Sequence, residues 1–410
     1  MLLSSVLERS VKHGSLIVID AKGISHSFGD GTDPKVIIRL HDPSLHWKIP
    51  VNPSLHAGEA YMDGRLTIER GSLRDFLDIT TRDIDTLQCA DPMHRAARFA
   101  GKMMRLAQQY NPLPRSQRNV AHHYDLSDRL YDLFLDGDRQ YSCAYFSDPS
   151  DSLSEAQNNK KVHIAAKLLL DRPGLRVLDI GSGWGGLGLF LAKVSGADVT
   201  GITLSREQVA RSEERAGAAG LSSKVRFRLQ DYRKEQGQYD RIVSVGMFEH
   251  VGAPQYPAFF GKLRDMLKPD GVALLHSIGR MDGPGITDPW IRKYIFPGGY
   301  APALSEVLPV IERMGLWVTD IEILRLHYAE TLKHWQANFH THRAEIAELY
   351  DERFCRMWEF YLAGSEMAFR NMNQMVFQIQ LAKQPTAVPL TRDYIQDWER
   401  TLRAKAIEAA

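Results

Sequence analysis

Three glycines in the stretch VLDIGSGWGGLG, residues 177–188, have a spacing that allows a backbone to approach a ligand closely. Gly181, Gly183 and Gly186 match the pattern GxGxxG, after an apolar run typical of a strand and before one typical of a helix. Glycine has no Cβ, and the first N–H groups of a helix can bind an anionic or polar ligand. Alone, the pattern predicts either a dinucleotide site or only a tight strand-to-helix turn.

Two further features favour S-adenosylmethionine over a dinucleotide. Asp179 lies two residues before Gly181, where a carboxylate can meet the ammonium group of that cofactor. A dinucleotide site needs Asp or Glu at the end of the second strand to bind a ribose. The next predicted strand, ADVTGITLS, ends instead in Thr203, Leu204 and Ser205. In this chain hydroxyl groups and Gln208 would have to bind the ribose.

The stretch LQDYR, residues 229–233, follows the third predicted strand and is the candidate adenine site. Asp231 can accept a hydrogen bond from an adenine amino group, and Tyr232 can pack on the ring. The alternative is structural, because Asp is also a common helix cap.

Cys143 lies in QYSCAYF, and the other two cysteines, Cys89 and Cys355, are far from it in the chain. An odd number of widely spaced cysteines favours neither a disulfide framework nor a structural zinc site, and is typical of a reducing cytoplasm. A nucleophilic thiolate needs a nearby base or positive charge. The stretch around Cys143 contains neither, so we interpret this residue as a small wall residue.

The elements that must position these residues are short apolar runs separated by helical segments from residue 172 onward. Strands alternating with helices predict a parallel sheet. Residues 330–372 predict a helical insertion. Residues 15–70 predict short strands, and residues 71–110 predict helices. We therefore predict an α+β domain at 1–110, a linker at 111–118 and an α/β catalytic domain at 119–410.

Charge and hydropathy restrict the partners. The 410 residues carry a formal net charge of +1, which argues against nucleic acid. No apolar stretch approaches the roughly 18 residues of a membrane span, and the N-terminus lacks a signal-peptide core. Residues 91–111 predict an amphipathic helix with regularly spaced basic residues, namely Arg95, Arg98, Lys102 and Arg105. Such a helix can dock on an anionic membrane, or it can pack between domains.

Together the motifs resemble those of the cyclopropane-fatty-acid synthase family, which includes the mycolic acid cyclopropane synthases. The resemblance runs from about residue 119 to 383, through QYSCAYF, LDIGSGWGGLG, GITLSREQ, LQDYR, DRIVSVGMFEHVG, LLHSIG and DPWIRKYIFPGG. It implies a class I methyltransferase, Rossmann-like α/β fold with a mostly parallel sheet. It also implies methyl transfer from S-adenosylmethionine to a cis double bond of a phospholipid, with bicarbonate as the base that precedes ring closure.

The resemblance also implies roles for individual residues. The cofactor would be bound by Tyr141, Ser142, Asp179, Gly181, Gly183, Gly186, Thr203, Leu204, Ser205, Gln208, Gln230, Asp231 and Tyr232. The bicarbonate site would use Cys143, Glu249, His276, Ile278 and Tyr328. No metal is implied. A homodimer associated peripherally with the inner face of the membrane would be the working form.

Two departures from the family pattern bear on this interpretation. Ser365 stands where some members have a cysteine, which argues against an obligatory covalent cysteine, and the loop reads GSG where many members read GCG. His276 could instead be a core histidine. The same site could yield a methyl-branched or methyl-unsaturated chain. The chain could also be a small-molecule or nucleic-acid methyltransferase, or a lipid-binding protein without activity.

Overall fold

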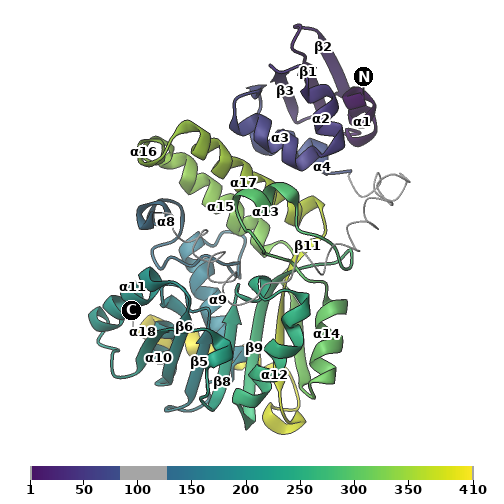
Figure 1. Cartoon of the computed structure of the whole chain (residues 1–410). Coiled ribbons are helices and arrows are strands. Elements are labelled where there is room, and N and C mark those ends of the chain that lie inside the picture. The colour runs from purple at the N-terminus through teal and green to yellow at the C-terminus, as the bar shows by residue number, and fades with distance from the viewer. Residues whose placement is uncertain (1, 84–126, 409–410) are drawn as a thin grey trace. The chain divides into compact units, whose positions relative to one another are not determined.

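The computed structural model describes residues 2–83 and 127–408, and its internal contacts divide the chain into two units (Figure 1). The first unit comprises Met1–Arg105, Gly285–Pro297 and Ala329–Gln374. The second comprises Leu106–Pro284, Gly298–Tyr328 and Met375–Ala410. Two stretches from the predicted 119–410 domain thus cluster with the N-terminal residues. The predicted basic helix at 91–111 and the linker at 111–118 lie outside the described residues.

The first unit contains a four-stranded mixed sheet. Its order is β2-β1-β3-β4, formed by β1 (Ser15–Ile19), β2 (Ser25–Gly29), β3 (Lys35–Leu40) and β4 (Leu66–Arg70). Strands β1 and β3 are parallel, and the other pairs are antiparallel. Alternate residues of β3 are buried, as the period of two along a strand requires. The accompanying helices are α1 (Leu2–Ser10), α2 (Leu45–Val51), α3 (Pro53–Met62) and α4 (Leu73–Thr81).

Helices from later in the sequence complete this first unit. They are α13 (Pro289–Tyr294), α15 (His327–Thr341) from Ala329 onward, α16 (Arg343–Leu349) and α17 (Glu352–Asn371). A Cβ on Gly58 of α3 would lie 2.5 Å from the Trp290 ring of α13, so the two helices meet without a side chain between them. Glu366 of α17 is fully buried and accepts hydrogen bonds from Arg74 of α4, at 3.0 Å from Nε.

The second unit is built on a seven-stranded sheet of order β10-β11-β9-β8-β5-β6-β7. Its strands are β5 (Arg176–Ile180), β6 (Asp198–Thr203), β7 (Val225–Leu229), β8 (Tyr239–Val245), β9 (Leu267–Arg280), β10 (Trp317–Ile323) and β11 (Gln374–Ala382). Strands β5 to β9 pair in parallel, and β10 is antiparallel to β11. This mostly parallel α/β sheet confirms the predicted class I methyltransferase fold.

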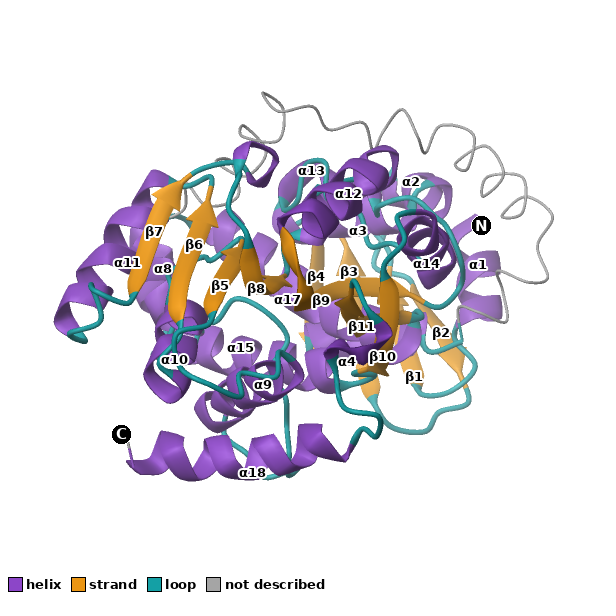
Figure 2. Cartoon of the chain, turned by 90° about the horizontal axis from the view of Figure 1, so that it is seen from below, coloured by secondary structure: helices purple, strands orange, loops and turns teal. Residues whose placement is uncertain are grey.

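Helices cover both faces of this sheet (Figure 2). One face packs against α12 (Tyr256–Met266) and α14 (Leu304–Arg313), the other against α9 (Leu153–Lys167), α10 (Gly186–Ser195), α11 (Arg206–Ala218) and α18 (Asp393–Glu408). On β5, Leu178 joins the first core and Val177 the second. Because both sides of each central strand are buried, these strands are rich in apolar residues on both faces.

The chain leaves β5 toward β6 and β7 on one side, and later adds β8 and β9 on the other. The connections from β5 and β8 therefore diverge at the carboxyl ends of these two strands. In open α/β sheets a crevice forms at such a point, and ligands bind there.

Candidate active site

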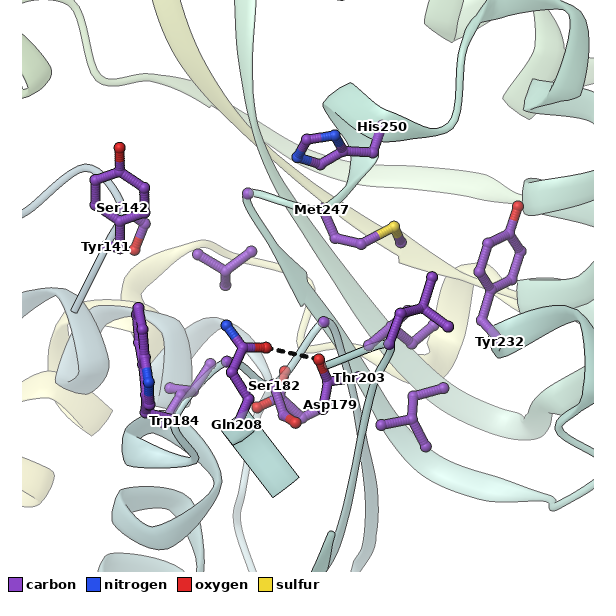
Figure 3. Close-up of a pocket in the computed structure, with 18 of the residues that line it drawn as sticks. Tyr141, Ser142, Asp179, Ser182, Trp184, Thr203, Gln208, Tyr232, Met247 and His250 are labelled. Atoms are coloured by element: carbon purple, nitrogen blue, oxygen red, sulfur yellow. Dashed lines mark hydrogen bonds between the residues drawn. The ribbon is translucent and has the colours of Figure 1, made fainter. Parts of the chain in front are cut away.

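A cavity of about 140 Å³ lies at the carboxyl ends of β5, β6 and β8 (Figure 3). Twelve of the thirteen predicted cofactor residues line it: Tyr141, Ser142, Asp179, Gly181, Gly183, Gly186, Thr203, Leu204, Gln208, Gln230, Asp231 and Tyr232. Ser205 does not line it. Residues from four separate stretches of the chain thus meet around one space, at the position expected for a nucleotide-like ligand.

The glycine turn between β5 and α10 requires glycine for two different reasons. Gly181 has φ +84°, and a Cβ there would lie 2.7 Å from Cβ of Met247. Gly183 also has a positive φ, of +54°, but a Cβ there would meet nothing within 4 Å. A Cβ on Gly186, at the start of α10, would lie 2.5 Å from the Gln140 amide. Glycine therefore allows the positive φ at residues 181 and 183. It also leaves room for Met247 beside residue 181 and for Gln140 beside residue 186.

Asp179, near the end of β5, is 1% exposed, and its Oδ2 has no hydrogen-bond partner. Burial raises the pKa of this carboxyl group to about 7, and the positive charge of Lys160 opposes that rise. An unpartnered buried carboxylate is costly unless a ligand satisfies it. The side chain is thus suited to meet the ammonium group of an amino acid, as the sequence predicts.

The predicted ribose residues separate into two roles. Thr203 donates a hydrogen bond to Oε1 of Gln208 at 2.7 Å, drawn in Figure 3, and both side chains line the cavity. Ser205 instead caps α11, because its Oγ accepts the N–H of Gln208 at 3.2 Å.

Asp231, predicted either to bind adenine or to cap a helix, does cap a helix, and its adenine role stays a prediction. It lines the cavity, and it also caps a 3-10 helix, because its Oδ1 accepts the N–H of Arg233 at 2.9 Å. The Arg233 guanidinium binds the same carboxylate at 2.7 Å. Tyr232 packs edge-on against Phe259, with ring centroids 5.3 Å apart.

Aromatic rings form the wall of the cavity that faces the predicted adenine site. Figure 3 places Tyr141 and Trp184 across the cavity from Tyr232. Tyr131, on α8 (Asp128–Phe134), supports both of them, with centroids 5.7 Å from Tyr141 and 4.8 Å from Trp184. Phe248, in the segment after β8, does not line the cavity and is fully buried in the core against Tyr256.

The residues predicted to bind bicarbonate lie in the segment after β8, on β9 and in two further segments of the chain. Glu249 lies in the 3-10 helix η2 (Phe248–His250) that follows β8, and its Oε1 accepts the N–H of Ile278 on β9 at 2.7 Å. Its Oε2 is buried without a partner. Burial raises the pKa of Glu249 to about 7, against the lowering effect of the Ile278 hydrogen bond. Glu249 and Ile278 are therefore in direct contact.

His276 lies two residues before Ile278 on β9 and is 2% exposed. Nε2 of Gln378 on β11 is 3.1 Å from its Nδ1. Because an amide NH2 donates, Nδ1 accepts and the ring proton lies on Nε2. Burial lowers the pKa of His276 to about 3, so the ring is neutral and can donate through Nε2.

Cys143 and Tyr328 lie on two segments that contact each other. Cys143 is 1% exposed and its thiol donates to the Ala144 carbonyl at 3.3 Å. Three residues later the N–H of Phe146 donates to Nδ1 of His327, the neighbour of Tyr328, at 3.0 Å. None of the five predicted bicarbonate residues lines the cavity, but Ser142 and His250, neighbours of two of them, do.

Sequence reasoning missed several residues that line the cavity: Arg139, Lys160, Ser182, Met247 and His250. Lys160 is the most informative of them, because it is 1% exposed. The signal was present in the sequence. Gln157, Lys160 and Lys167 recur at helical spacing among apolar residues, and all three are buried on α9. Polar side chains on the buried face of a helix often mark a site.

No group of three potential metal ligands occurs within residues 2–83 and 127–408. The chemistry of the site is that of carboxylates, one ammonium group, a neutral imidazole and aromatic rings.

Comparisons with known proteins agree with this geometry. The family model described as mycolic acid cyclopropane synthetase matches residues 112–379, and a second, described only as a domain of unknown function, matches residues 3–88. A probable fatty acid methyltransferase of Pseudomonas putida is 35% identical over 381 residues, covering 90% of this chain and 93% of that protein. The cyclopropane-fatty-acyl-phospholipid synthase of Escherichia coli K12 is 38% identical over 348 residues, covering 84% and 87%.

Among solved structures, mycolic acid cyclopropane synthase CmaA1, complexed with SAH and CTAB, has a TM-score of 0.62 at 33% identity and covers 67% of this chain and 99% of that one. The fold and the cavity thus define an enzyme of the S-adenosylmethionine-dependent methyltransferase class. Within that class, the chain belongs to the mycolic acid cyclopropane synthetase family.

Proposed function

We propose that this protein transfers a methylene unit from S-adenosylmethionine to the cis double bond of an unsaturated phospholipid acyl chain, forming a cyclopropane ring. The observation that carries the proposal is the buried carboxyl group of Glu249, with one oxygen bound to Ile278 and the other without a partner. When a methyltransferase acts on a hydroxyl or an amine, the substrate loses a proton from oxygen or nitrogen. Ring closure requires removal of a proton from carbon, and an anion site beside the cofactor serves that step.

The cavity supports the cofactor assignment. Its unpartnered Asp179 carboxylate fits the ammonium group, and Thr203, Gln208 and Asp231 offer polar atoms for the nucleoside. When bound, S-adenosylmethionine supplies an electrophilic methyl group. The protein's part is to orient it, and to keep water away from the positive charge that forms on the acyl chain. Trp184 and Tyr141 present ring faces or edges to this space, and cation–π attraction is worth roughly 0.5–2 kcal/mol for each ring.

The side chains of Glu249 and His276 support a bicarbonate site. Oε2 of Glu249 can accept the proton of a bicarbonate, and the Nε2–H of neutral His276 can donate to its oxygens. Cys143, Ile278 and Tyr328 complete the proposed site. When bound, bicarbonate supplies a base of suitable size. The balance on the acyl chain is one methyl group gained and one proton lost, so the product gains CH2 and no redox partner is needed.

A second candidate is a fatty-acyl methyltransferase, favoured by the name of the Pseudomonas putida relative. The same first step would then be followed by proton loss from a neighbouring carbon, or by addition of hydride from a separate reductant. The first route leaves a methyl-unsaturated chain and the second a methyl-branched chain. A small-molecule substrate is a more distant alternative.

We further propose that the protein works peripherally at the inner, cytoplasmic face of a membrane and that it forms a homodimer. Within the part of the chain that the structure describes, no helix is long and apolar enough to cross a bilayer. The Escherichia coli relative is named for a phospholipid substrate. Flotation with anionic and with neutral vesicles tests this placement, and the variant Arg95→Glu/Arg98→Glu tests the basic helix predicted at 91–111.

The experiment for the bicarbonate site is turnover in carbon-dioxide-free buffer, followed by addition of bicarbonate. We expect activity to be low and then restored by bicarbonate but not by formate. Full activity in depleted buffer would mean that a protein group removes the proton.

A further inference from the structure

Lys160 is a buried cation in the wall of the cofactor cavity. It lies on α9, is 1% exposed and lines the cavity. Its Nζ donates to Oε1 of Gln140 at 2.7 Å and to Oγ of Ser142 at 2.8 Å. Both partners are neutral. Among the described residues no carboxylate lies within ion-pair distance of Nζ, whereas Lys161 and Lys167 on the same helix both have one.

A buried ammonium group without an ion pair is costly. An ammonium group has three donors, and the hydrogen bonds to Gln140 and Ser142 use two of them. Consistent with this cost, burial lowers the pKa of Lys160 to about 8. The cavity wall therefore contains the ammonium group of Lys160, which forms no salt bridge with any of the described residues.

Asp179 carries the opposite charge in the same cavity, and its Oδ2 has no hydrogen-bond partner. The positive charge of Lys160 lowers the pKa of Asp179 against the effect of burial, yet the two side chains form no salt bridge in the described structure. Arg139 and Asp231 also line the cavity, but each of them has a salt-bridge partner. A cavity with a buried ammonium group and a buried carboxylate that are not in salt bridges is complementary to a zwitterion. The α-amino acid end of the cofactor is such a zwitterion.

The loop beside Lys160 is held by a different residue. Nε2 of Gln157, one turn earlier on α9, donates to the carbonyl of Ser142 at 3.0 Å and to that of Gln140 at 3.2 Å. Gln157 thus binds the backbone of this loop, and Lys160 binds only its side chains. The charge of Lys160 is not needed to fix the path of the loop.

We propose that Lys160 binds the α-carboxylate of the cofactor's methionyl group, together with the hydroxyl of Ser142, while Asp179 faces the α-ammonium group. The inference rests on the assignment of this cavity to S-adenosylmethionine. Lys160 is then the residue that distinguishes the intact cofactor from analogues that lack the carboxylate.

The test is calorimetric titration with S-adenosylmethionine and with decarboxylated S-adenosylmethionine, which lacks only the carboxylate. For Lys160→Met we expect the Kd of the intact cofactor to rise by about 10- to 100-fold, the range for a lost charged hydrogen bond. The Kd of the decarboxylated analogue should change by less than about threefold, as for a substitution that touches no contact. Lys160→Gln, which keeps an amide donor near Ser142, should give the same contrast.

Two control variants separate the roles. Gln157→Leu removes the backbone hydrogen bonds and should weaken both ligands by similar factors. Lys224→Met removes a surface lysine that pairs with Asp198 and should change neither. Similar weakening of both ligands by Lys160→Met and Lys160→Gln would overturn the proposal and make Lys160 a support of the loop. If neither variant folds, equal affinity of the wild-type protein for the two ligands would overturn it as well.

A different result would show that the assignment of this cavity to S-adenosylmethionine is wrong. A wild-type protein that binds neither ligand would remove S-adenosylmethionine from this cavity, and the inference on Lys160 with it.

Discussion

The two carboxylate oxygens of Glu249 have different surroundings, because Ile278 binds only one of them. The Ile278 N–H donates to Oε1 at 2.7 Å, and Oε2 is buried without a partner. Glu249 follows strand β8, and Ile278 lies near the end of strand β9. These strands pair in parallel, so the sheet brings the two residues together. One oxygen therefore holds the side chain in place, and the other remains available to a ligand.

Changing Glu249 to Gln should remove turnover while sparing cofactor binding. The Gln amide oxygen can still accept the Ile278 N–H, but its NH2 cannot accept a proton from bicarbonate. We expect product formation to fall by about 100-fold or more, as for loss of a positioned acid–base group, with the Kd of S-adenosylhomocysteine within about threefold. Glu213→Gln, at an exposed position, is the control. Unchanged turnover of Glu249→Gln would sink the bicarbonate site.

The same variant has a predictable effect on stability. The pKa of Glu249 in the folded protein, about 7, lies above the ordinary value of 4.5. Stability from this group is therefore fully present below about pH 4.5 and is lost as the pH rises to about 7. Glu249→Gln should unfold at a temperature no lower than the wild type at pH 8. A clear drop in Tm would show that the carboxylate has a stabilising partner besides the Ile278 N–H.

Cofactor affinity should be greatest between about pH 7 and pH 8, the shifted pKa values of Asp179 and Lys160. The ligand's ammonium group favours ionised Asp179, so protonation below about pH 7 weakens binding. The ligand's carboxylate favours charged Lys160, whose pKa Asp136 and Asp138 raise and Lys161 lowers. Binding titrations from pH 5.5 to 9.5 measure the fall in affinity on both sides of this optimum. The Asp179→Asn variant should lose only the fall on the acidic side. A profile that is flat throughout would contradict both roles.

Replacing Gly181 or Gly183 by Ala should separate two causes of lost stability, namely backbone strain and a steric clash with Met247. Gly183→Ala introduces only the strain of a left-handed backbone, about 1–2 kcal/mol. Gly181→Ala introduces the same strain and in addition forces Met247 to move from 2.7 Å. Urea unfolding without cofactor should therefore show the larger loss for Gly181→Ala. Equal losses would mean that Met247 gives way freely.

Ser205→Ala should cost stability but not cofactor affinity. Loss of this N-cap is expected to lower the free energy of unfolding by about 1 kcal/mol. Thr203→Val removes a hydroxyl that lines the cavity and binds Gln208, so it should weaken S-adenosylhomocysteine more than Ser205→Ala does. Weak binding by Ser205→Ala with normal stability would return Ser205 to the ribose site that the sequence predicts for it.

The sequence predicts the sheet and the glycine turn well, because both depend on local patterns. Strand β5 is mostly apolar, with Val177, Leu178 and Ile180, and Gly181 has a positive φ that glycine adopts easily. Lys160 was missed because its burial depends on the loop at 140–142, which is distant in sequence. The sequence also does not predict that α13 and α17 group with the N-terminal residues, because this grouping depends on contacts between distant segments. The contact of Trp290 with Gly58 and that of Arg74 with Glu366 join segments that are more than 200 residues apart.

The most direct test of the proposed function is the mass of the product. The purified protein is incubated with S-adenosylmethionine and vesicles of a cis-monounsaturated phospholipid, and the released fatty acids are analysed by mass spectrometry before and after mild hydrogenation. The account predicts a gain of one CH2 with no further uptake of hydrogen, which is the signature of a cyclopropane. A gain of CH2 with an alkene that still takes up hydrogen, or of CH2 plus two hydrogens, would contradict ring formation and establish the fatty-acyl methyltransferase instead.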